Sequence, residues 1–183
     1  QRESGGWSKA RFAILDDNQK AMLRGNPTLT TVPWAEHIDL RIPTLDNGST
    51  FTQMKYLALV HNARVAGGGK DEDTRRVRES FLKGLDYILD LQFDCGGWPQ
   101  QSRREDGSFW SYTGNITFND HVTVYALTML QDVVDGKFAS APDADLGFVD
   151  QERRQRAAAA VKRGIDCILK CQIIVDGNPT VWS

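Results

Sequence analysis

Four stretches of the chain carry apolar residues at the spacing of three and four that is typical of amphipathic helices. They span 49–64, 77–92, 120–134 and 152–172. In the last stretch the apolar stripe is Val161, Ile165, Ile168 and Leu169. The stretch 120–134 is apolar nearly all round, which favours a buried inner helix.

The segments between these stretches predict loops. Residues 66–73 are rich in glycine and acidic side chains, and 136–147 begin and end with glycine around Pro142. Both segments lack strand patterning. With four helical stretches and no predicted strand, the chain is expected to be all-α.

The chain repeats itself with a long period. Residues 83–89 match 163–169 at a distance of 80 residues, and a Gly-Gly-Trp sequence occurs at 5–7 and again at 96–98. Internal repetition of this kind usually indicates helix pairs that are stacked or arranged in a ring.

Two carboxylate–amide pairs stand where two of the helices begin: Asp46-Asn47 and Asn119-Asp120, 73 residues apart. One interpretation is capping, in which these side chains accept hydrogen bonds from free helix amides, worth about 0.5–2 kcal/mol. The other is that one side chain caps while its neighbour faces a shared acidic cleft. Such a cleft suits a hard cation or a polar, anionic substrate, and both interpretations stay open.

Tryptophans and arginines in the loops suggest a second set of candidates. Trp7 and Trp98 follow Gly-Gly, where an aromatic face could stack on a sugar, but recurrence at repeat positions favours anchoring of the loops onto the core. The polar loop 99–115 carries Arg103 and Arg104, which suit the carboxylates of an acidic sugar. The alternative for that loop is a solvated surface.

Size and charge restrict the possible partners. The chain has 183 residues, 40% hydrophobic and 25% charged, which fits one globular domain spanning 1–183. A formal net charge of -2 gives no overall attraction to nucleic acid. No apolar run approaches the roughly 20 residues of a membrane helix. We expect a monomer with neither nucleic acid nor membrane as a partner.

Cysteine and histidine give little sign of a metal centre. Cys167 and Cys171 are four apart in a predicted helix and share a face. They are either a metal or redox pair or small core residues, and the lack of a nearby His or further Cys favours the core. His37, His61 and His121 show no ligand spacing.

The order of several motifs resembles the family 10 pectate lyases over nearly the whole chain. The motifs are Glu3-Ser4-Gly5-Gly6-Trp7, Leu45-Asp46-Asn47-Gly48-Ser49-Thr50, Gly84-Leu85-Asp86-Tyr87-Ile88-Leu89, Gly96-Gly97-Trp98-Pro99-Gln100 and Ile116-Thr117-Phe118-Asn119-Asp120. Any Gly-Gly-Trp alone is a weak signal, and the set in sequence order is specific.

The resemblance implies a fold, a reaction and a cellular location. The fold is an (α/α) toroid, expected to be incomplete in this chain. The reaction is calcium-assisted β-elimination of polygalacturonate, by a secreted or periplasmic enzyme. In that context Asp120 and Asp46 are predicted to be catalytic and calcium-binding. The predicted substrate contacts are Asn47, Trp98, Arg104 and Asn119.

The resemblance also implies that something is missing. The family is thought to use an arginine as base, in a region that would follow Ser183, so the chain is expected to be a C-terminally truncated domain without that residue. The alternative function is a non-catalytic helical module that binds an acidic glycan. A toroid of terpene cyclisation is a third reading, and the arginine-rich polar loop argues against it.

Overall fold

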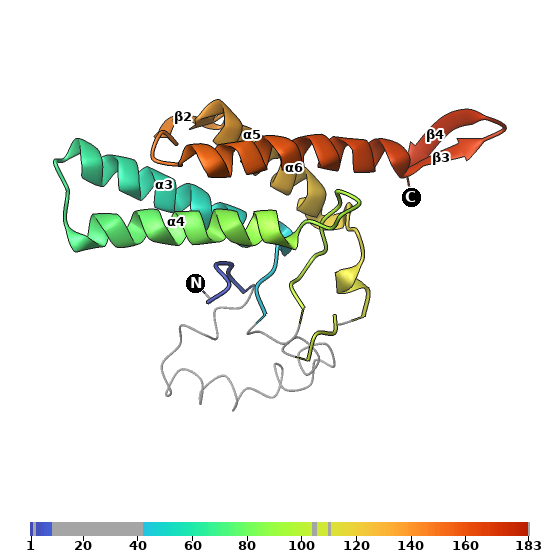
Figure 1. Ribbon diagram of the computed structural model, residues 1–183, viewed down its shortest axis with the longest axis horizontal. Coiled ribbons are helices and arrows are strands. Elements are labelled where there is room, and N and C mark those ends of the chain that lie inside the picture. The colour runs from blue at the N-terminus through green and yellow to red at the C-terminus, as the bar shows by residue number, and fades with distance from the viewer. Residues whose placement is uncertain (2, 9–41, 104–105, 110, 183) are drawn as a thin grey trace, which may run out of the picture.

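The computed structural model describes residues 1, 3–8, 42–103, 106–109 and 111–182, and Figure 1 shows it as a ribbon. In chain order the elements are η2 (Asp46–Gly48), α3 (Phe51–Ala66), α4 (Glu72–Leu91), η3 (Ser111–Gly114), η4 (Asn119–His121), α5 (Val122–Asp135), β1 (Lys137–Phe138), β2 (Ala141–Asp145), α6 (Gln151–Lys170), β3 (Gln172–Val175) and β4 (Asn178–Trp182). All four predicted helices are confirmed, and α4 begins five residues before the predicted stretch.

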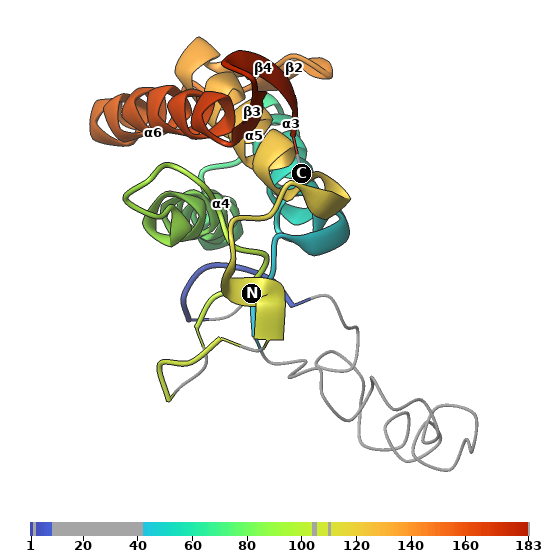
Figure 2. The same cartoon turned by 90° about the vertical axis from the view of Figure 1, so that its right-hand side faces the viewer.

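The four α-helices form two hairpins that pack side by side. Helix α3 contacts α4 and α5 contacts α6, while α4 also contacts α6 and α3 contacts α5. Figure 2 shows α4 and α6 on one side of the bundle and α3 and α5 on the other. The largest fully buried side chains between them are Trp98, Phe81, Phe138, Leu45, Met54 and Leu85. None of the described helices has the length and apolarity to cross a bilayer.

Helix α6 buries a face that the apolar stripe did not predict. Ile165 and Leu169 are 48% and 60% exposed, and the buried residues of the helix are Ala157, Ala160, Gly164 and Cys167. A β-carbon on Gly164 would lie 2.8 Å from the ring of Trp98. Close approach of the helix to that ring therefore requires small residues, while Ile165 and Leu169 stay exposed.

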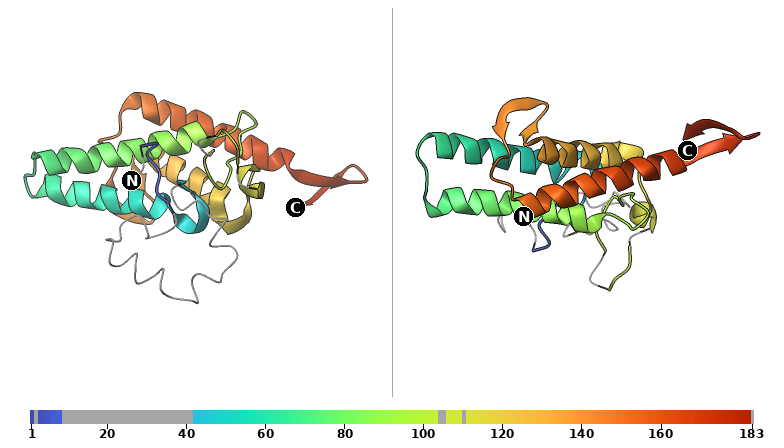
Figure 3. Two further views of the ribbon diagram at one scale, coloured as in Figure 1. Left: turned by 90° about the horizontal axis from the view of Figure 1, so that it is seen from below. Right: turned by 45° about the horizontal axis from the view of Figure 1, so that its top comes forward.

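Two short hairpins correct the expectation of an all-α chain. Strands β1 and β2 pair antiparallel inside the predicted loop 136–147, and β3 pairs antiparallel with β4 at the end of the chain. Figure 3 shows β3 and β4 projecting beyond the helices. The described part of the chain is thus mostly helical with two β-hairpins, and closure into a toroid stays a prediction.

The two halves of the predicted repeat have the same local structure. Trp7 packs against Gly84, and Trp98 packs against Gly164. Matching hydrogen bonds follow each tryptophan: Thr44 N donates to Trp7 O (3.0 Å) and Thr117 N to Trp98 O (2.9 Å), while Thr50 Oγ1 donates to Thr44 O (2.9 Å) and Thr123 Oγ1 to Thr117 O (2.7 Å). The carboxylate–amide pairs therefore occupy equivalent places in the two units.

Helix α6 begins with a side-chain N-cap, Asp150, and this gives a testable prediction. Asp150 accepts a hydrogen bond from the backbone N–H of Arg153 at 3.0 Å, which holds the pKa of Asp150 below its ordinary value, with the Arg153 side chain adding to the effect. Asp150→Ala should lower the free energy of unfolding by about 1 kcal/mol at pH 7, measured by urea denaturation.

The pH dependence of that cap follows from the sign of the shift. Because the folded-state pKa is lowered, the stabilisation is present above about pH 3.9 and is lost as pH falls through the folded-state value. The difference between wild type and Asp150→Ala should therefore shrink in acid. Asp150→Asn keeps a capping oxygen, so it should cost less at pH 7. Equal losses for Ala and Asn would contradict the role of the cap hydrogen bond.

Candidate functional site

The two carboxylate–amide pairs lie next to each other. The short helices η2 and η4, which carry Asp46-Asn47 and Asn119-Asp120, contact each other, and both contact α5. Asn47 has φ 50 and ψ 35, and Asp120 has φ 50 and ψ 27. This left-handed conformation is tolerated best by Gly, Asn and Asp, so the backbone explains the residue types at these two positions.

Neither pair caps a long helix. Helix α3 follows Thr50 and α5 follows His121, and neither helix has a side-chain hydrogen bond at its N-cap. The capping interpretation of the two pairs is therefore wrong. Their proximity fits the other interpretation, a shared acidic site, which stays a prediction.

The four side chains offer oxygen atoms of two kinds. Asp46 is buried, with 8% of its surface exposed, and Asp120 is half-buried, whereas Asn47 and Asn119 are exposed. Asn119 Nδ2 donates a hydrogen bond to Asp120 Oδ2 at 3.1 Å. Carboxylate and amide oxygens are ligands that calcium accepts. In the part of the chain that the structure describes, no three His, Cys, Asp or Glu side chains gather as a metal group, so a calcium ion here would also need other oxygens.

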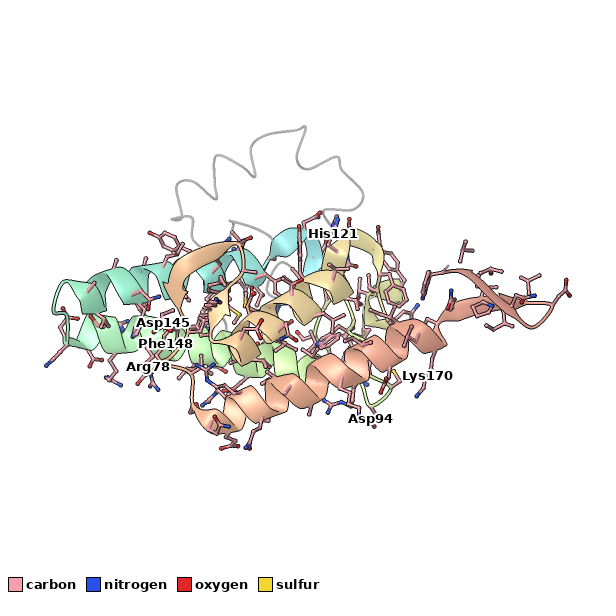
Figure 4. The ribbon with its side chains drawn as sticks, turned by 90° about the horizontal axis from the view of Figure 1, so that it is seen from above. Arg78, Asp94, His121, Asp145, Phe148 and Lys170 are labelled. Carbon is pink, nitrogen blue, oxygen red and sulfur yellow. The ribbon has the colours of Figure 1, made fainter. Side chains whose placement is uncertain are left out.

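An aromatic pair extends this surface along α5. The rings of His121 and Tyr125 stack with centroids 5.2 Å apart and an angle of 19°, and Tyr125 meets Phe51 edge-on at 5.8 Å. Figure 4 shows His121 where η4 ends and α5 begins. Tyr125 is 39% exposed. The sequence did not predict the exposure of Tyr125, because the apolar pattern of 120–134 favoured a buried inner helix.

A cavity of about 430 Å³ opens beside Asn47. Its walls come from η2, α3, α5 and the β1–β2 hairpin, and its polar lining includes Lys55, Asp132 and Ser140. Gly48 also lines it. The cavity and the two carboxylate–amide pairs therefore belong to one continuous region of the surface.

Two predicted substrate contacts lie elsewhere. Trp98 is completely buried, and its indole Nε1 donates to the carbonyl of Ile88 at 3.0 Å. A ring with no exposed surface cannot stack on a sugar, so loop anchoring explains Trp98 and its predicted substrate contact is wrong. Arg104 lies outside the described residues. Its neighbour Arg103 lies over the ring of Phe109 at 4.5 Å and donates to Gly107 O at 2.9 Å.

Cys167 lies in the last turn of α6, Cys171 follows the end of that helix, and the loop that carries Cys95 contacts Cys167. Cys167 is buried, Cys171 half-buried and Cys95 exposed, and all three are free thiols. Burial raises the pKa of Cys167 to about 11, with a smaller contribution from the thiols of Cys171 and Cys95. The core interpretation therefore holds for Cys167 and only partly for Cys171.

Comparison with known proteins identifies the family. Residues 1–183 match the family described as Pectic acid lyase. The chain is similar to a solved family 10 polysaccharide lyase from Cellvibrio cellulosa, with 27% identity and a TM-score of 0.66, over 100% of this chain and 46% of that one. A mutant of that lyase in complex with trigalacturonic acid matches with the same identity and TM-score, over 100% and 47%.

No curated protein matches the chain. The chain spans slightly less than half the length of the solved structures that it matches. Because the family match covers every residue, the chain belongs to the pectic acid lyase family.

Proposed function

We propose that this chain takes part in the cleavage of polygalacturonate by calcium-assisted β-elimination. The observation that carries the proposal is the contact between η2 and η4, which brings the carboxylates of Asp46 and Asp120 to one region of a chain in this family. A similar lyase has been solved with trigalacturonic acid, which supports an acidic oligosaccharide as the ligand.

The β-elimination requires a positive charge beside the carboxylate of the uronate. Removal of the proton at C5 of the sugar places negative charge on the neighbouring carboxylate, and a bound divalent cation stabilises that charge. The carboxylate oxygens of Asp46 and Asp120 fit calcium, which prefers oxygen ligands. In this proposal the two carboxylates hold the ion, and the two exposed amides contact the sugar.

The resemblance supplies the wider setting of the proposal. The two helix hairpins would form part of an (α/α) toroid, and the protein would be secreted or periplasmic. These points extend the family membership and the partial match to a longer lyase.

The test follows the unsaturated product by its ultraviolet absorbance. The complete natural protein is mixed with polygalacturonate, first with calcium and then with an excess of chelator. We expect product to form with calcium and to stop forming with chelator. Equal rates in both conditions would overturn the role of calcium. Tight binding of oligogalacturonate without any product would overturn the lyase activity and favour a glycan-binding module.

A further inference from the structure

The loop that carries Cys95 is held against α6 by direct contacts. A β-carbon on Gly96, the next residue, would lie 3.2 Å from the β-carbon of Cys167. Gln92 Nε2 donates hydrogen bonds to the carbonyl oxygens of Gly96 (2.8 Å) and Ala160 (2.9 Å), so one side chain joins the loop to the helix. The fold therefore fixes the loop and the helix in contact where Cys95 and Cys167 stand.

Cys167 has two other thiols as neighbours at this contact. It is 3% exposed, whereas Cys171 is half-buried and Cys95 is exposed. Burial, followed by the charge and hydrogen bonding of the Cys171 and Cys95 thiols, raises the pKa of Cys167 to about 11. Hydrogen bonding between thiols acts only at short range, so both neighbours are candidates for a disulfide with Cys167.

The helical geometry of Cys171 makes it the less suitable partner. Its backbone N–H donates to the carbonyl oxygen of Cys167 at 3.0 Å, so the last turn of α6 is intact. In an intact turn the β-carbons of residues four apart are separated by about 5–6 Å, whereas a disulfide holds them about 3.5–4.5 Å apart. A bond between Cys167 and Cys171 would distort the helix end. Cys95 belongs to a loop, so helical spacing does not restrict it.

The chain that follows Cys95 supports both carboxylate–amide pairs. The carbonyl oxygen of Gln100 accepts a hydrogen bond from the backbone N–H of Leu45 at 2.8 Å, directly before the first pair. The carbonyl oxygen of Trp98 accepts one from the backbone N–H of Thr117 at 2.9 Å, two residues before the second pair. A covalent link between this loop and α6 would therefore hold the support of the candidate site in place.

We propose that Cys95 and Cys167 form a disulfide that ties the Gly-Gly-Trp loop of residues 96–98 to α6. The oxidant is a small-molecule disulfide such as oxidised glutathione. The exposed Cys95 attacks it as a thiolate, forms a mixed disulfide and releases one glutathione thiol. The Cys167 thiolate then attacks Cys95 Sγ and releases the second. Two protein thiols are oxidised, one glutathione disulfide is reduced, and the two protons pass to the released thiols. The secreted or periplasmic location already proposed would preserve the bond.

Peptide mapping shows which cysteines are joined. The complete natural protein, Cys95→Ser and Cys171→Ser are each equilibrated with oxidised glutathione or with a reducing agent, and the remaining thiols are then blocked. Trypsin cleaves after Arg163 and Lys170, so Cys167 and Cys171 fall on separate peptides and Cys95 falls on a third. Mass spectrometry of the oxidised samples should find Cys95 linked to Cys167 in wild type and in Cys171→Ser. Cys95→Ser should lack the link.

A thermal melt measures what the bond does for the fold. Oxidation should raise the melting temperature of wild type and Cys171→Ser by about 5–10 °C, because a disulfide across a long loop restricts the unfolded chain. Cys95→Ser should show no such rise, and because Cys95 is exposed this variant removes no core side chain.

Three results would overturn the disulfide. They are three blocked thiols in oxidised, folded wild type, a link between Cys167 and Cys171 in place of the expected one, and a thermal rise that persists in Cys95→Ser. The measurement involves no polygalacturonate, so each of these results would leave the proposed function standing.

Discussion

Asp120→Asn is expected to remove calcium-dependent cleavage of polygalacturonate and to leave the fold intact. The backbone at this position has φ 50, and the equivalent position in the other unit, Asn47, shows that asparagine adopts the same conformation. The substitution therefore takes away a carboxylate without straining the chain. Loss of one charged calcium ligand should lower the rate at limiting calcium by about a hundredfold or more.

The measurement is the initial rate of product formation across a calcium titration, together with a thermal melt of each protein. Asp94→Asn is the matched control, since Asp94 is exposed and lies across α6 from His121 in Figure 4. It should behave as wild type. If Asp120→Asn keeps its calcium-dependent rate, Asp120 is not the proposed ligand. A lowered melting temperature with activity retained would assign Asp120 a structural role.

Helical periodicity predicted the helices well where the apolar stripe of the sequence is also the face that the fold buries. In α4 the spacing of Phe81, Leu85 and Ile88 places one stripe in the core, and all three are completely buried. The repeat was equally visible, because each Gly-Gly-Trp sequence and each helix that it packs against recur in the sequence. Two units with the same close contacts need the same small and large residues at matching positions.

Helical periodicity did not predict the buried face of α6, where small residues let the helix approach its neighbours closely. Helix α6 approaches its neighbours through Ala157, Ala160 and Gly164, and a hydrophobic pattern gives such residues little weight. The sequence did not predict the β1–β2 hairpin, for a different reason. Two residues in one strand are too few to show an alternation, and the hairpin is instead tied to α5 by Asp132.

The candidate site was predicted in part, through the residue types of the two pairs. Their meaning as caps was wrong because Asn and Asp favour helix starts and left-handed turns alike, and only the backbone distinguishes the two. The sequence did not predict the cavity. Its lining includes Asn47 of η2, Lys55 of α3 and Ser140 of the turn between β1 and β2, and no spacing along the chain relates them.

Gly96→Ala should destabilise the protein strongly, because two separate costs fall on one methyl group. Gly96 has φ +98, a conformation that costs a residue with a β-carbon about 1–2 kcal/mol. The new β-carbon would lie 2.1 Å from the carbonyl oxygen of Arg163 on α6, which forces a backbone shift worth about 1–3 kcal/mol. Together these costs predict a loss of about 2–5 kcal/mol in the free energy of unfolding, measured by urea denaturation.

Gly107→Ala separates the two costs. Gly107 has φ +79 but nothing lies within 4 Å of its would-be β-carbon, so only the backbone cost of about 1–2 kcal/mol applies. Gly5 should behave like Gly96, since a β-carbon there would lie 1.9 Å from Lys83 O on α4. Losses for Gly96→Ala and Gly5→Ala that only equal the loss for Gly107→Ala would show that the loops do not need such close contact with the helices. Larger losses at both positions would show that each Gly-Gly-Trp loop places its helix through a backbone contact, in the same way in both units.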